Sequence, residues 1–252
     1  MNILRIIKEL YAGKNNLTAQ IGLLALLGIA AISYNEILSF FTGNTLYAVF
    51  ATPSDIEIII YAMSAIMISI FFIGYIFKFV HESYSEDKIE LPSVSLNCFT
   101  IFAKFLPLMF IWSIYLFIAI YVFILLFGFG IVELSISLLI LLTLLPFINI
   151  VYFLFAKNFK YDIKLFNPLI IPQIMQKTFV PVAKLVAQYL LTGFVIGFIF
   201  SILLIIPYKS QCSQIVRMIS ILAIICINIY CYQVLNLAFS RGLTDIIKKN
   251  LI

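Results

Sequence analysis

The sequence is poor in the residues that catalysis and soluble folding require. Only 11% of its 252 residues are charged, and His81 is the one histidine. Soluble domains carry about 25% charged residues, so this composition excludes a soluble domain. A single histidine also excludes a His-rich metal site and a Ser–His or Cys–His nucleophile pair elsewhere in the chain. The sequence has no phosphate-binding loop and no paired intramembrane aspartates, and we expect no enzyme activity, no metal ion and no cofactor.

Cysteine is scarce as well. The four cysteines are Cys98, Cys212, Cys226 and Cys231, and no two of them form a CxxC pair. In the topology argued below only Cys212 lies on the oxidising side, so the chain has no disulfide framework. We expect buried thiols that pack as small apolar side chains.

Titratable side chains gather in one loop between the second and third apolar stretches. They are His81, Glu82, Glu86, Asp87 and Glu90. Carboxylates suit a hard divalent cation, but this loop lacks the Asp-x-Asp spacing and the glycine turn of a dedicated site. We interpret it as a solvated connection between two membrane elements.

Hydrophobic residues are abundant, at 64% of the total, and they occur along the whole chain. Six apolar stretches each approach the ~20 residues that cross ~30 Å of hydrocarbon. They cover residues 17–41, 56–79, 105–130, 134–156, 186–207 and 216–239. Gly128, Gly130 and Glu133 predict a tight outer turn between the third and the fourth. The sequence therefore predicts an all-α polytopic membrane helical bundle, with residues 1–252 as a single integral membrane domain.

The first apolar stretch has a second interpretation. A basic start followed by the short run Ile21–Ser33 is also typical of a cleaved signal peptide. The apolar segment continues to Phe41, which favours a retained span. Glu36 is the one acidic residue inside this span, close to its outer end, and we expect its side chain to reach outward to water.

The basic residues indicate the orientation of the spans. All but Lys209 and Arg217 of the 16 lie before span one, between spans two and three, between spans four and five, or after span six. Basic residues stay in the cytoplasm during insertion, so both termini are predicted to be cytoplasmic, in a bacterial cytoplasmic membrane. The net charge of +5 then indicates attraction to anionic inner-leaflet lipid, not to nucleic acid.

The two long inner connections resemble each other at an offset of 80 residues. Pro92 aligns with Pro172, and Lys104 with Lys184. Each copy has polar residues along one helical stripe. The stripes are Ser93, Asn97, Thr100 and Lys104, and Gln173, Gln176, Lys177 and Lys184. We predict interfacial amphipathic helices over 92–104 and 172–184, an internal parallel repeat with units 56–130 and 134–207, and a third basic helix over 2–12 beside span six.

The segment between spans two and three resembles domain-of-unknown-function family 4013. It has Gly74-Tyr75 at the end of a span, then Lys78, an acidic loop and Leu91-Pro92 before an amphipathic segment. Residues 166–184 lie where the second copy of that segment would be. The resemblance implies a prokaryotic polytopic membrane protein and assigns no activity.

Two sets of residues are candidates for function. Basic residues predicted to face lipid headgroups are Arg5, Lys8, Lys104, Lys177 and Lys184. An intramembrane polar cluster is predicted from Asn149, Asn228, Tyr232, Gln233 and Asn236. Amides inside hydrocarbon must face protein or trapped water, so the cluster either joins helices by hydrogen bonds or lines a small polar cavity between spans four and six.

The sequence does not define a substrate. We expect a non-enzymatic membrane scaffold or assembly subunit that contacts lipid and membrane protein partners. The alternative is a facilitator or permease subunit for a small or lipidic solute, since parallel repeats also occur in transporters.

Overall fold

The computed structural model describes residues 3–12, 16–42, 54–85, 90–128, 130–209 and 214–252. All regular structure in these ranges is helical, which confirms the prediction of an all-α fold. The α-helices are α1 (Ile3–Ala12), α2 (Asn16–Thr42), α3 (Asp55–Ser85), α4 (Asn97–Phe127), α5 (Ile131–Asn158), α6 (Ile170–Lys209) and α7 (Gln214–Asn250). A short 3-10 helix, η1 (Ile163–Phe166), precedes α6.

Four helices, α3, α4, α6 and α7, are long and apolar enough to cross a membrane. Their length and composition are compatible with an integral membrane protein. In α2 and α5 the apolar stretches found among the described residues are shorter, Thr18–Ser33 and Thr143–Asn158.

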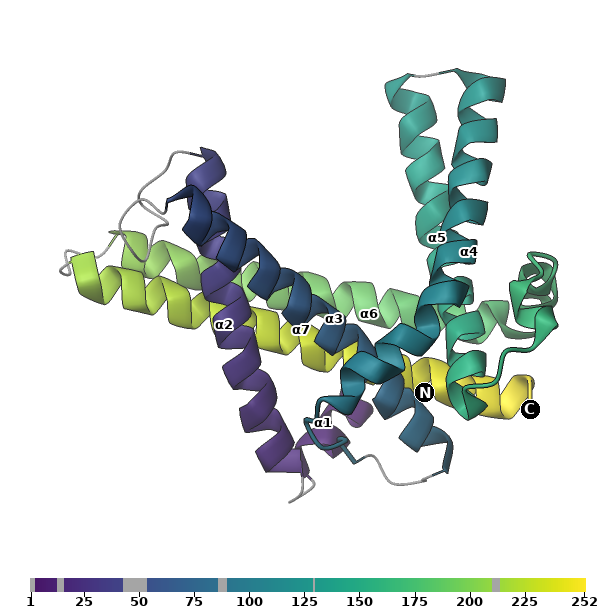
Figure 1. Cartoon of the computed structure of the whole chain (residues 1–252), viewed down its shortest axis with the longest axis horizontal. Coiled ribbons are helices and arrows are strands. Elements are labelled where there is room, and N and C mark those ends of the chain that lie inside the picture. The colour runs from purple at the N-terminus through teal and green to yellow at the C-terminus, as the bar shows by residue number, and fades with distance from the viewer. Residues whose placement is uncertain (1–2, 13–15, 43–53, 86–89, 129, 210–213) are drawn as a thin grey trace.

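The buried side chains gather in one region, which we call the hub. Tyr75, Phe105, Phe155 and Leu243 are among its largest fully buried residues. In Figure 1 the hub lies in the lower part of the molecule, on the side where both termini are marked. The hub is built from α1 and from the segments 19–27 of α2, 71–83 of α3, 98–112 of α4, 146–156 of α5, 171–185 of α6 and 234–247 of α7.

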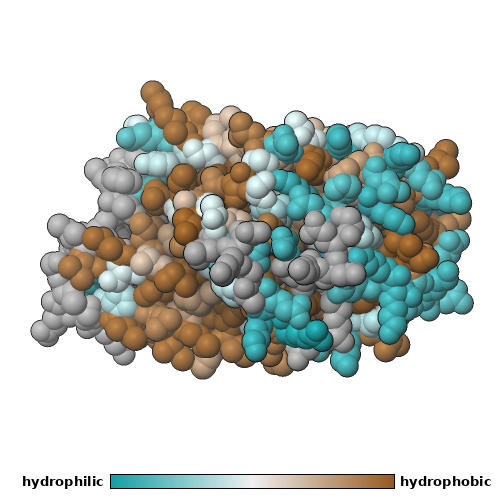
Figure 2. Space-filling model, turned by 90° about the horizontal axis from the view of Figure 1, so that it is seen from below, coloured by the Kyte–Doolittle hydropathy of each residue, from teal (hydrophilic) through white to brown (hydrophobic). Residues whose placement is uncertain are grey.

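Away from the hub the same helices expose apolar side chains. Phe117 of α4 is 71% exposed and Phe194 of α6 is 73% exposed. The outer ends of α2, α3, α6 and α7 reach to the left in Figure 1, whereas the α4–α5 hairpin projects upward and away from them. Figure 2 shows polar residues over the side where the termini lie and apolar residues over the other.

Close packing of α3 on α4 organises the hub. Gly74 lies against the start of α4, where a Cβ would overlap the Cys98 carbonyl oxygen. Farther along, the rings of Phe77 and Phe105 stack with centroids 3.5 Å apart. Glycine is required at the first contact because only its lack of a side chain lets the two backbones approach.

The predicted interfacial helices are not separate elements. Residues 92–96 are not helical, and α4 then runs unbroken from Asn97 into the predicted third span; α6 likewise runs from Ile170 to Lys209. The boundary prediction was wrong because the change from an amphipathic to an apolar stretch after Lys104 and Lys184 does not end a helix, and neither do Pro107 and Pro181 inside α4 and α6. Proline removes one hydrogen bond and bends a helix, and apolar helix-forming residues on both sides keep it continuous.

The outer turn between α4 and α5 lies three residues earlier than predicted. Gly128 ends α4 with a φ of 90°, a left-handed conformation that glycine adopts without strain. Glu133 lies within α5, not in the turn. The other two predicted outer connections lie largely outside the described residues.

Glu36 does not reach outward as predicted. Its side chain is fully buried, because α2 packs along α3. The helix predicted over the first residues is present as α1, and α7 lies beside it as expected. The apolar residues Ile3, Ile6 and Leu10 of α1 are buried in the hub.

Candidate functional site

The first inner connection is fixed to α3 by the residues that carry the family resemblance. The Tyr75 hydroxyl donates to the Pro92 carbonyl at 2.9 Å. The Lys78 ammonium donates to the Ser93 carbonyl at 2.9 Å and lies 3.2 and 3.3 Å from the hydroxyls of Ser93 and Ser95. Tyr75 and Lys78 are one helical turn apart, so both reach the same connection.

A buried asparagine joins three segments that are distant in the sequence. The Asn16 amide donates to the Leu10 carbonyl at 2.9 Å and accepts from the Leu91 backbone N–H at 2.7 Å. Asn16 is completely buried, so both bonds replace water contacts that the backbone groups have lost. Asn16 was not predicted as a site residue, because it lies in a polar stretch before the first apolar run, with Asn15 and Thr18 beside it, and nothing local distinguishes it from them.

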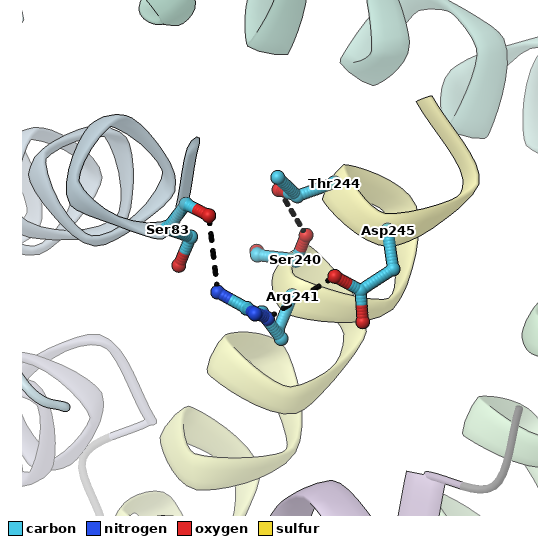
Figure 3. Close-up of polar contacts among 5 residues, drawn as sticks. All are labelled: Ser83, Ser240, Arg241, Thr244 and Asp245. Carbon is cyan, nitrogen blue, oxygen red and sulfur yellow. Dashed lines mark hydrogen bonds and ion pairs between the residues drawn. The ribbon is translucent and has the colours of Figure 1, made fainter. Parts of the chain in front are cut away.

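A buried arginine connects α7 to the end of α3 (Figure 3). The Arg241 guanidinium donates to the Ser83 carbonyl at 3.1 Å, and its Nε lies 3.2 Å from the Asp245 carboxylate. Ser83 is in the last turn of α3, where carbonyls lack intrahelical partners and a cation is favourable. Arg241 therefore closes the end of α3 and holds it against α7.

From the sequence, Arg241 was predicted only as one of the basic residues that keep the C-terminus in the cytoplasm. Its side chain is 6% exposed, whereas that of Asp245 is 34% exposed. The spacing of four residues between arginine and aspartate on a helix was the available signal. Beside this pair the hydroxyls of Ser240 and Thr244 donate to carbonyls of their own helix.

The second inner connection is held by α4. The Trp112 indole donates to the Leu165 carbonyl at 2.9 Å, and the Tyr115 hydroxyl donates to the Phe166 carbonyl at 3.0 Å. Tyr161 donates in return to the Lys104 carbonyl at 2.6 Å. The two connections are thus held by different helices, α3 for the first and α4 for the second.

His81 has a structural contact. Its Nδ1 lies 2.8 Å from the Ala156 carbonyl, which can only accept, so this nitrogen carries the proton. Glu86 and Asp87 of the predicted acidic loop lie outside the described residues. No group of three or more metal-ligating side chains occurs in the part of the chain that the structure describes.

The predicted headgroup-facing residues are all exposed. They are Arg5, Lys8, Lys104, Lys177 and Lys184. Arg5 pairs with Glu9 at 2.8 Å, and the Lys104 ammonium lies 5.3 Å from the ring centroid of Phe159. Exposed apolar side chains lie near them, including Leu4 on α1 and Val180 on α6.

The predicted polar cluster is only partly brought together. The Tyr189 hydroxyl donates to Asn236 Oδ1 at 2.7 Å, and Asn236 Nδ2 lies 3.5 Å from Gln233 Oε1. Tyr232 donates instead to the Gly193 carbonyl at 2.9 Å, where α7 packs on the face of α6 that carries Gly193 and Gly197. Among the described residues Asn228 makes no hydrogen bond to the other members, and its Oδ1 is buried without a partner.

Asn149 and Asn236 both line one cavity of about 270 Å³. The cavity is bounded by α3, α4, α5 and α7, and its wall is otherwise mostly apolar and aromatic. It lies between the helices that the sequence numbers as spans four and six, where a small cavity was one of the two expected arrangements.

The fold and these contacts are compatible with a helical membrane protein whose helices are joined at one end by buried polar bonds. The chain matches no protein-family model, no curated protein and no solved structure. The resemblance to domain-of-unknown-function family 4013 therefore stays a prediction.

Proposed function

We propose that this protein is a non-enzymatic scaffold or assembly subunit that crosses a bacterial cytoplasmic membrane six times, with both termini in the cytoplasm. The observation that carries the proposal is the division between a tightly bonded hub and apolar outer helices. The hub contains the ends of the chain and the segments predicted to be cytoplasmic. Its fixed geometry suits it to hold partners in register, and the apolar outer faces suit contact with lipid or with other membrane helices.

Anionic lipid is the first proposed partner. Lys104, Lys177 and Lys184 extend from the hub beside apolar surface, and a basic residue near an anionic leaflet contributes about 1 kcal/mol. Replacing all three with Gln is expected to weaken binding of anionic lipid at least tenfold while the fold is retained. The measurement is lipid titration of purified protein, followed by native mass spectrometry.

A second triple variant gives a matched control. Lys160, Lys164 and Lys249 are also exposed, and their replacement with Gln removes the same charge. Equal loss in both variants would show that only total charge matters. Unchanged lipid binding in the first variant would leave those lysines with a role in topology alone.

Membrane proteins are the second proposed class of partner. Co-purification from native membranes, with identification of bound protein and lipid, tests the scaffold directly. A reproducible stoichiometric partner supports it. A protein that purifies alone from gently solubilised membranes contradicts it.

The six-span topology has its own test because the α4–α5 hairpin diverges from the other helices. We propose that both arms cross the bilayer and that the bends at Pro107 and Pro146 let the hairpin align with the rest. In a cysteine-free background, a Cys at Gly128 should react with an impermeant thiol reagent from outside the cell, and a reporter fused after Ile252 should be active only in the cytoplasm. Protection of Gly128→Cys from outside would place the hairpin within the membrane.

The parallel repeat and the family resemblance belong to the same proposal. Both predicted polar stripes have exposed members on the hub surface, Lys104 in one and Lys184 in the other. Exchanging residues 97–104 and 177–184 between the two copies should therefore give a folded protein, judged by gel filtration. Aggregation of the exchanged chain would argue against equivalent units.

A facilitator for a small or lipidic solute is the second candidate. The observation in its favour is the cavity shared by Asn149 and Asn236. Flux measured in proteoliposomes distinguishes the two functions, because a scaffold needs no solute movement.

A further inference from the structure

The cavity between α3, α4, α5 and α7 lies where the α4–α5 hairpin leaves the hub. Phe77 of α3, Met109 of α4, Asn149 of α5 and Asn236 of α7 contribute to its wall. Pro146 is three residues from Asn149, and Pro107 is two residues from Met109. The cavity is therefore lined both by the α4–α5 hairpin and by α3 and α7.

The hydrogen-bonding groups on its wall are not fully used. The Asn149 amide makes no hydrogen bond to the side chains and backbone of the described residues, and it is only partly buried. Asn236 accepts from Tyr189 through Oδ1, which leaves its Nδ2 with the long 3.5 Å contact to Gln233. An amide has two donor hydrogens and an acceptor oxygen, so the cavity wall can both donate hydrogen bonds to a ligand and accept them from it.

The remaining wall limits what can bind. No lining residue carries a charge at neutral pH, and Phe77, Phe153 and Phe239 supply aromatic surface. An anionic headgroup would lose its hydration without gaining a cationic partner here. A hydrocarbon would leave the Asn149 amide without a hydrogen-bond partner, and an unpaired amide in an apolar environment costs free energy.

We propose that this cavity binds an uncharged amphiphile, a molecule with an apolar chain and a hydroxyl or carbonyl group that bonds to Asn149 and Asn236. The volume of about 270 Å³ lies just below the roughly 300–1,000 Å³ of pockets that enclose drug-sized ligands. It therefore takes the polar end and the first carbons of such a molecule, with the rest of the chain outside. This proposal rests on the facilitator function proposed above, because it names a class of solute. It requires only that the amphiphile binds, so a protein that binds it without transporting it would support this proposal and contradict the facilitator function.

The test uses the full chain in nanodiscs of zwitterionic lipid and a twelve-carbon alcohol that bears a photoreactive diazirine. Labelling is expected on tryptic or chymotryptic fragments that contain Met109, Asn149 or Asn236. Unlabelled dodecanol should compete about tenfold better than dodecane, and dodecyl sulfate should compete no better than dodecane. A net hydrogen bond of ordinary strength corresponds to about a tenfold change in affinity.

Two variants and one control decide the role of the cavity. Asn149→Leu removes the free amide without breaking a bond, and should reduce labelling about tenfold. Met109→Trp fills the space and should abolish labelling even if the first variant misfolds. Asn228→Leu makes the same change of side chain on α7 outside the cavity, and should label like the parent. Labelling that both cavity variants retain, equal competition by alcohol and alkane, or no labelling at all would overturn the proposal.

Discussion

The inner and outer halves of α4 both carry large apolar side chains, but these side chains have opposite surroundings. Phe105 and Leu108 are completely buried in the hub, whereas Phe117 is 71% and Leu126 is 72% exposed. Both halves are apolar enough to leave water. The difference shows that hydrophobicity determines only that a segment avoids water, and that packing partners determine whether protein or, in the proposed topology, lipid surrounds it.

This comparison predicts different sensitivities to mutation in the two halves. Hub side chains fit fixed neighbours, so a lost atom leaves a cavity. In the proposed topology the outer side chains face fluid lipid, which fills the space that a truncated side chain leaves. Trp112 is the one tryptophan and is buried in the hub, so its fluorescence during denaturation in mild detergent reports unfolding of the hub.

The largest effect is expected from Gly74→Val. The new side chain would overlap the Cys98 backbone carbonyl, which cannot move without displacing the start of α4. We expect a loss of at least about 3 kcal/mol in the free energy of unfolding, or failure to fold. The control is Gly28→Ala on α2, where no heavy atom lies within 4 Å of the new Cβ, and alanine should stabilise the helix by up to about 1 kcal/mol. Equal effects at both glycines would refute the close approach of α3 and α4.

Phe105→Ala and Phe117→Ala compare the two halves directly. The first removes a fully buried ring that stacks on Phe77 and should cost about 3–5 kcal/mol. The second removes an exposed ring and should change the free energy of unfolding by no more than about 0.5 kcal/mol. Similar losses in both variants would indicate that the hairpin is packed against protein, which would contradict the division into hub and outer halves.

Arg241→Met tests the charge that closes α3. The change leaves the Ser83 carbonyl without its donor and Asp245 without its cation. Asp245 is about a third exposed and can turn to water, so we expect a loss of about 2–3 kcal/mol, less than for a fully buried pair. Lys249→Met, an exposed change of the same kind on the same helix, should be nearly neutral in the same denaturation experiment. A stable Arg241→Met protein would mean that α3 is held by apolar contacts alone.

Asn16→Ala is expected to have the smallest effect of the four. It removes the acceptor for the buried Leu91 N–H and one of two donors to the Leu10 carbonyl, which keeps its bond from Gln20, at a cost of about 1–2 kcal/mol. Hydrogen exchange should show earlier opening of Leu91 than of the α4 backbone. Asn97→Ala, at an exposed position, serves as the control. Unchanged exchange at Leu91 would show that water takes the place of the amide.

Patterns local in sequence gave the most accurate predictions. The apolar runs located the helices, and the spacing of polar residues placed Lys104 and Lys184 on exposed faces, because both depend on helical periodicity. The prediction failed for the limits of α4 and α6, since a change from an amphipathic to a fully apolar stretch alters what surrounds a helix without ending it. It also failed for Glu36, whose burial depends on the path of α3.

The candidate site was predicted less well for the same reason. Asn149 and Asn236 were recognised as polar residues in apolar helices, but 87 positions separate them in the chain, and only the meeting of α5 and α7 places them on one cavity. Asn228 looked equivalent in sequence and lies elsewhere.

The sequence by itself determined that the chain is helical and that its long segments avoid water. Both properties depend on composition and periodicity within a few residues of the chain. The tertiary structure alone decided that Gly74 meets Cys98, that Arg241 closes α3, and that the inner ends of α3, α4, α6 and α7 contribute buried side chains to the hub. These contacts join segments that are far apart in the chain, and the free energy of each depends on how tightly the two surfaces fit, which no local pattern encodes.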